Sequence, residues 1–148
     1  MKISIIYPDQ QPASAALAHS LAAVMPPDVR IAPVSEADTA EAELVLAVFT
    51  LKQGSFAPTV GRFRELRDKK VALVPILTGE VERGRVMKTV WGSKKQFCGN
   101  YMMGAYLCPA VGEPGRELVA EDEAKKVQAF AGRVLNNCSE TGKAALAA

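Results

Sequence analysis

The sequence predicts an α/β protein: a doubly wound parallel sheet of five strands in the order 2-1-3-4-5, with helices on both faces. Short apolar runs typical of buried strands alternate with segments of helical periodicity along the chain. This alternation favours parallel pairing, because a helix must return the chain to the start of each next strand. Right-handed crossovers leave few strand orders. The 148 residues, 49% hydrophobic and 23% charged, fit one globular domain.

Prolines delimit the first two strands and the helix between them. Residues 2–7 are apolar and rich in β-branched side chains, and Pro8 ends this strand. Pro12 is suited to begin a helix, where its missing N–H would have had no partner. Residues 29–34 form the second strand, and His19 should face solvent. The helix has an apolar stripe at helical spacing, formed by Leu17, Leu21, Val24 and Met25.

Three further strands are predicted at residues 43–49, 70–77 and 104–108. Pro75 lies inside the second of these and cannot donate a ladder hydrogen bond, so it requires a bulge or an unpaired position. Short amphipathic helices are predicted over residues 60–66 and 86–91. They would complete the two crossovers among these strands.

The last predicted helix has acidic residues in its first turn, where the helix dipole favours them. Its apolar stripe is formed by Ala124, Val127, Phe130, Val134 and Leu135. We expect one domain over residues 1–136 and a frayed C-terminal tail over residues 137–148, since that tail is small and polar.

Composition excludes several classes of function. No apolar run approaches the roughly 20 residues of a membrane helix, and the N-terminus does not resemble a signal peptide. Three cysteines without a C-x-x-C pair, with a single His, predict no metal site and free thiols in a cytoplasmic protein. No carboxylate pair, Ser-His-Asp set or nucleotide P-loop is present, so no catalytic residue is predicted.

Charge is unevenly distributed along the chain. The net charge is +2, but residues 52–95 carry eleven basic and four acidic side chains, a local balance of +7. Such a segment favours an anionic ligand or an acidic partner, or it is simply a solvated face. Nucleic acid is not predicted as a partner, because few aromatic side chains are interleaved with the basic ones.

In a sheet of this kind the ligand crevice lies at the carboxyl ends of the strands, where the winding direction reverses. This rule selects three loops, at residues 8–14, 50–58 and 78–84. The order and spacing of the strands resemble those of the flavodoxin family, in its short stand-alone members, over residues 1–136. The similar segments are residues 3–7, 16–18, 44–49, 69–73 and 104–109. The resemblance implies noncovalently bound flavin mononucleotide (FMN) and electron transfer between redox partners.

The phosphate loop of the family corresponds here to Tyr7-Pro8-Asp9-Gln10-Gln11-Pro12-Ala13-Ser14. In flavodoxins this loop surrounds the phosphate with backbone N–H groups and hydroxyls at a helix N-terminus. Here Ser14 keeps a family hydroxyl, Gln10 and Gln11 can donate from their side chains, and Pro12 lacks an N–H. Asp9 would repel a phosphate. The candidate phosphate-binding residues are Asp9, Gln10, Gln11, Ala13 and Ser14, in a degenerate loop of weakened affinity.

The flavin-ring loops are altered as well. Thr50 stands where related proteins carry a Trp, followed by Leu51, and Gly54 is retained. Phe56, or Trp91 and Tyr101 elsewhere, could supply an aromatic face for stacking. The remaining candidates of the resemblance are Thr78 and Gly79, in the third loop.

Two functions follow. The first is an FMN-binding electron carrier that works with a redox partner protein. The alternative is a flavodoxin fold that has lost FMN and serves as a binding or interaction module. The degenerate loop favours the alternative, and the order of the segments favours the carrier.

Overall fold

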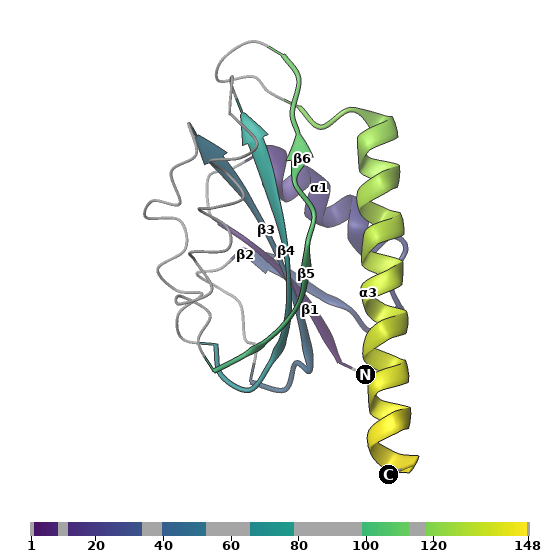
Figure 1. Ribbon diagram of the computed structural model, residues 1–148. Helices are drawn as coiled ribbons and strands as arrows, with labels where there is room; N and C mark the ends of the chain where they lie inside the picture. Colours follow the sequence, from purple (N-terminus) through teal and green to yellow (C-terminus); the bar gives the residue numbers. More distant parts are fainter. Residues whose placement is uncertain are drawn as a thin grey trace.

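The computed structural model describes residues 2–8, 12–33, 40–52, 66–78, 99–112 and 118–147. Figure 1 shows the described strands and helices in their order along the chain. The described elements are β1 (Ile3–Tyr7), α1 (Pro12–Ala22), β2 (Arg30–Pro33), β3 (Leu44–Lys52), β4 (Lys70–Thr78), β5 (Tyr101–Ala105), β6 (Cys108–Pro109) and α3 (Glu121–Ala147).

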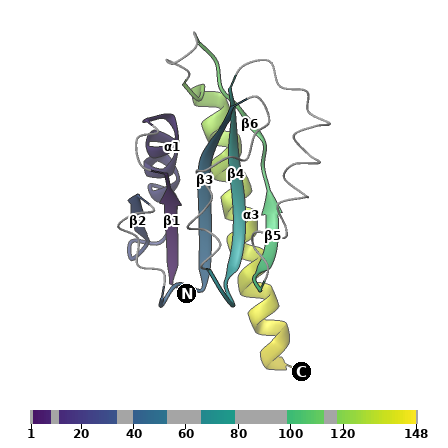
Figure 2. The same ribbon diagram turned by 90° about the vertical axis from the view of Figure 1, so that its left-hand side faces the viewer.

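All strand pairs in the sheet are parallel, and the strand order is β2-β1-β3-β4-β5 (Figure 2). The short strand β6 continues along β4 beyond the end of β5. The predicted fold class and strand order are therefore confirmed. The chain leaves β1, returns through α1 to β2 at the edge, and then crosses to β3 on the other side of β1.

The fifth strand differs from its prediction. The sequence predicted one strand over residues 104–108, whereas the structure has β5 at residues 101–105 and β6 at residues 108–109. A register shift occurs within β5, because Val71 pairs with Met102 and Ala72 pairs with Gly104. Met103 is thus the extra residue of a β-bulge, which a pattern of apolar residues does not reveal.

Pro75 explains the gap between β5 and β6. The carbonyl of Leu73 accepts a hydrogen bond from the N–H of Tyr106 at 2.9 Å, and the carbonyl of Leu77 accepts one from Ala110 at 2.9 Å. Alternate residues of a strand present their backbone groups to the same neighbour, so Pro75 faces this edge too. It has no N–H to donate, and the ladder is interrupted beside it, as predicted.

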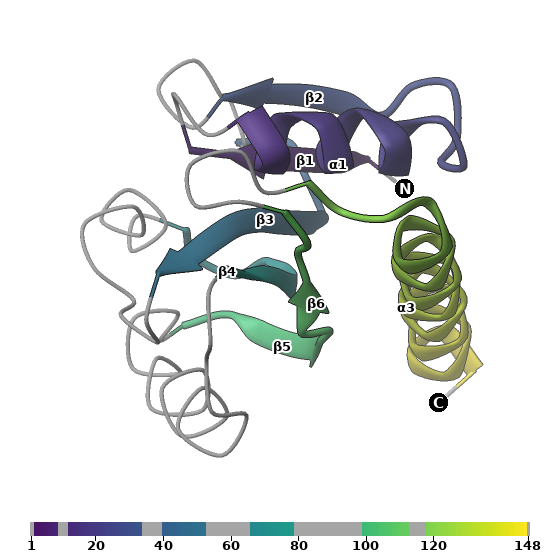
Figure 3. The ribbon, with the colours of Figure 1, turned by 90° about the horizontal axis from the view of Figure 1, so that it is seen from above.

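The helices α1 and α3 lie on the same face of the sheet (Figures 1 and 3). The apolar stripes of both helices pack against alternate residues of β1, β3 and β4. The side chain of Gln128 ties the two helices together by donating to the carbonyl and hydroxyl oxygens of Ser20, each at 3.0 Å. The central buried side chains of this core are Ile5, Leu17, Leu21, Leu44, Leu46, Val48, Val74, Ile76, Val127 and Val134.

The opposite face of the sheet is also buried. Its side chains include Phe49, Val45 and Leu73, each fully inaccessible to solvent. Residues 60–65 and 86–91, which make up most of the two predicted short helices, lie outside the described residues, and Leu66 is buried.

The ends of two helices differ from prediction. Helix α1 ends at Ala22, so Val24, which was placed in the apolar stripe, is 51% exposed, whereas Met25 is buried. Helix α3 continues to Ala147, so most of the segment predicted as a frayed tail is helical. Cys138, beyond the predicted end of the domain at residue 136, packs into the core with this helix.

Candidate functional site

The strand order reverses between β1 and β3, at the beginning of α1 (Figure 3). In doubly wound sheets, ligands bind at the carboxyl ends of the strands at such a reversal. The last paired residues are Ile6 of β1 and Ala47 of β3. Pro8 follows β1 and has no N–H to extend the ladder. The remainder of β3 therefore projects past β1, beside the first turn of α1.

Two residues predicted for the cofactor site meet where the first turn of α1 lies beside the end of β3, a place called the corner below. The hydroxyl oxygens of Ser14, in the first turn of α1, and Thr50, near the end of β3, are 2.8 Å apart. Ser14 is fully buried and Thr50 is half-buried. The side chains of Leu46 and Val48 face α1. Thr50 is two residues further along β3, so its side chain lies on the same face of the strand. The sequence predicted each residue separately but not their hydrogen bond.

The first turn of α1 also provides backbone donors. The first N–H groups of a helix have no partner within the helix, and they lie at the positive end of its dipole. Ala13 and Ser14 follow Pro12, which begins the helix as predicted. Ala13 is half-buried, in contrast to Ser14. The corner therefore combines donors on α1 with a hydroxyl on β3.

The third predicted loop begins at the same edge of the sheet. Leu51 pairs with Leu77, and Lys52 pairs with Thr78, so β3 and β4 end at the same level. The other predicted site residues, Asp9, Gln10, Gln11, Gly54, Phe56 and Gly79, lie outside the described residues, and so does Trp91.

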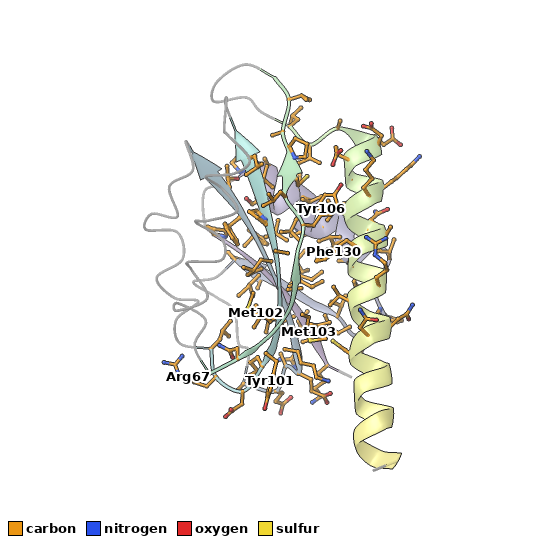
Figure 4. The ribbon with its side chains drawn as sticks, viewed as in Figure 1. Arg67, Tyr101, Met102, Met103, Tyr106 and Phe130 are labelled. Carbon is orange, nitrogen blue, oxygen red and sulfur yellow. The ribbon has the colours of Figure 1, made fainter. Side chains whose placement is uncertain are left out.

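Tyr101 does not belong to this edge. It is the first residue of β5 and pairs with Lys70, the first residue of β4. It therefore lies at the amino ends of the strands, and its side chain is 68% exposed (Figure 4). Its suggested role in stacking on the flavin ring is wrong, because parallel strands keep their two ends on opposite edges.

The two described thiols are buried structural groups. Burial, together with the nearby carboxylate of Glu123, raises the pKa of Cys108 from its ordinary 9.0 to about 12. Burial also raises the pKa of Cys138, with Lys70 opposing the effect. Neither thiol is poised to ionise near neutral pH, and His19 is exposed, as expected.

Other features narrow the chemistry of the described part of the chain. No three His, Cys, Asp or Glu side chains among the described residues are grouped so that they could hold a metal ion. In the same residues, no helix combines the length and the apolar character needed to cross a membrane.

Three solved structures are similar to the chain. A flavodoxin from Streptococcus pneumoniae TIGR4 matches 93% of this chain and 99% of its own, with a TM-score of 0.66 and 12% identity. A WrbA-like flavodoxin from Agrobacterium tumefaciens matches 94% and 98%, with a TM-score of 0.59 and 10% identity. A flavoprotein from Lactobacillus acidophilus, solved in complex with FMN, matches 72% and 92%, with a TM-score of 0.52 and 12% identity.

No protein-family model matches the sequence, and no curated protein matches it. The likeness thus lies in the arrangement of strands and helices rather than in residue identity. It agrees with the strand order and with the position of α1 at the reversal. The chain has the flavodoxin-like α/β fold, and its structural neighbours are flavodoxins and flavodoxin-like proteins.

Proposed function

We propose that this protein binds FMN noncovalently at the carboxyl edge of its sheet and carries electrons between redox partners. The observation that carries the proposal is the reversal of strand order between β1 and β3, with α1 beginning at that point. Ligands of doubly wound sheets bind at such points. One structural neighbour was solved with FMN, which supports the choice of ligand.

The described donors suit the phosphate of such a ligand. The backbone N–H of Ala13 and the helix dipole of α1 favour an anion at the start of the helix. The Ser14 hydroxyl of this turn is 2.8 Å from the hydroxyl of Thr50. None of these described donors is acidic, so they add no repulsion to that expected from Asp9. When bound, FMN supplies the electron chemistry, and the chain supplies binding, orientation and charge.

The partner and compartment belong to the same proposal. Residues 52–95 carry a net charge of +7, which would attract an acidic redox protein and speed its association. The free thiols Cys108 and Cys138 are compatible with a reducing cytoplasm.

One observation favours a second function. Ser14, the family hydroxyl that the phosphate loop retains, is fully buried and already hydrogen-bonded to Thr50. A corner closed in this way suits a protein that has lost its flavin and uses the fold as an interaction module.

Titration of purified protein into FMN separates the two functions. The carrier should quench FMN fluorescence with a saturable 1:1 curve, and the bound flavin should be reduced and reoxidised reversibly. Riboflavin and adenosine monophosphate serve as controls for the ring and for the phosphate. Colourless protein that causes no quenching at high micromolar FMN would reject the carrier and leave the interaction module.

A further inference from the structure

We propose that Thr50 is a positioning residue: its hydroxyl and that of Ser14 act as one unit that fixes the first turn of α1 for the phosphate of FMN. The inference rests on the proposed function and assigns to Thr50 a role other than that of the residue found there in related proteins. It depends on the hydrogen bond between two elements that are far apart in the sequence.

The geometry makes the two hydroxyls interdependent. Their oxygens are 2.8 Å apart, a normal length for an O–H···O hydrogen bond. Ser14 is fully buried, and none of the buried side-chain polar atoms in the described part of the chain lacks a hydrogen-bond partner. Each of the two residues also makes a further interaction, so removal of one hydroxyl removes a shared contact of the other without leaving it unpaired.

A displacement of either hydroxyl would also move the backbone of the corner. Ser14 lies next to Ala13 in the first turn of α1, and Thr50 lies in the part of β3 that projects past β1. The hydrogen bond therefore joins the start of the helix to the end of β3. The orientation of the first-turn N–H groups depends on that joint.

Burial also assigns the direct contacts. Because Ser14 has no solvent-accessible surface in this arrangement, we assign its hydroxyl a supporting role and assign the direct contact to the first turn at the half-buried Ala13. The side chain of Thr50 is turned to Ser14. At the end of β3, Thr50 thus acts on the phosphate-binding turn and provides no aromatic ring for stacking on the flavin.

The test compares the ratio of FMN to riboflavin affinity in wild type, Ser14→Ala, Thr50→Val, the double variant and Thr50→Ser. The ratio isolates the phosphate, because riboflavin carries the same ring without it. Ser4→Ala is the matched control, since Ser4 is a buried serine of β1 within the same sheet. Circular dichroism verifies that each variant is folded, and Thr50→Ser retains the hydroxyl.

Both single variants should lower the ratio by a similar factor, about three- to tenfold, as expected for one lost hydrogen bond. The double variant should lose no more than either single variant, because the two residues form one unit. Thr50→Ser and Ser4→Ala should keep the wild-type ratio.

Four results would overturn the inference. A loss in Ser14→Ala alone would make Ser14 a direct phosphate ligand, and additive losses would make the residues independent. Unchanged ratios in a wild type that binds FMN would refute the inference and leave the proposed function standing. A wild type that binds neither flavin would reject the proposed function itself and the inference with it.

Discussion

The core beneath α1 and α3 and the corner at the start of α1 are stabilised by different contacts. The core consists of buried apolar side chains from six elements, and Leu46 and Val74 are fully buried within it. The corner is joined by the hydroxyl pair of Ser14 and Thr50. Many small van der Waals contacts stabilise the core together, whereas the geometry of the hydrogen bond in the corner can be altered by one substitution.

This difference separates stability from binding. Loss of a core side chain should lower the free energy of unfolding and leave the ligand site of the folded molecules intact. Loss of a corner hydroxyl should change ligand affinity more than stability, because it affects one hydrogen bond at the edge of the sheet.

Leu46→Ala should have the largest effect on stability. Leu46 is fully buried in β3 between β1 and β4, so truncation leaves a cavity that the rigid sheet cannot close. We expect a loss of about 2–5 kcal/mol in the free energy of unfolding, measured by urea denaturation. Below the transition, the folded variant should retain the FMN affinity of wild type.

Val24→Ala is the matched control, because Val24 is 51% exposed beyond the end of α1. It should change the unfolding free energy by no more than about 0.5 kcal/mol. Equal losses in the two variants would contradict the assignment of Leu46 to a tightly packed core.

The core was predictable from the sequence because apolar periodicity reports burial directly. The stripe of α1 at Leu17 and Leu21 and the continuous run of β3 both appear in the structure as expected. Val24 was misplaced because the end of α1 depends on local backbone geometry and not on periodicity alone.

The corner was only half predictable. Ser14 and Thr50 were candidates through resemblance to flavodoxins, but a hydrogen bond between residues 36 positions apart depends on register and helix placement. The bulge at Met103 was missed for a similar reason: it depends on how β5 aligns with β4. Tyr101 was misassigned because it lies at the amino end of its strand, on the edge of the sheet opposite the candidate site.

Gly104→Ala should have the next largest effect, and it tests the bulge. Gly104 has φ +150°, and a Cβ at this position would lie 3.3 Å from the ring of Phe130 (Figure 4 labels Phe130). Backbone strain and this tight contact should together lower the free energy of unfolding by about 1–3 kcal/mol in thermal or urea melts.

The variant Phe130→Leu with Gly104→Ala separates the two causes. If contact with the ring causes the loss, Gly104→Ala should lower the free energy of unfolding less in the Phe130→Leu background than in wild type. If backbone strain causes the loss, Gly104→Ala should lower it equally in both backgrounds. A neutral Gly104→Ala would show that the bulge tolerates a side chain and that β5 has another register in solution.

Alkaline pH tests whether water reaches the core at Cys108. We expect this to be the smallest of the effects on the free energy of unfolding. The pKa of Cys108 is about 12 in the folded protein and ordinarily 9.0, because burial and Glu123 disfavour the thiolate. Below pH 9 the thiol is neutral in both states, and its contribution to stability is fully present. Above pH 9 the unfolded chain loses the proton and the folded chain keeps it, so stability falls as pH rises toward 12.

The expected slope is about 1.4 kcal/mol per pH unit within that window. We would measure the unfolding free energies of wild type and Cys108→Ala at pH 8 and at pH 10. The comparison isolates the contribution of Cys108, because the other titrating groups are common to both proteins. The difference between the two should shrink by about 1.4 kcal/mol between these pH values. Parallel curves would mean that water reaches Cys108 and that the edge at β6 opens. The core would then resemble the corner in depending on a few local contacts, and the contrast between the two regions would be lost.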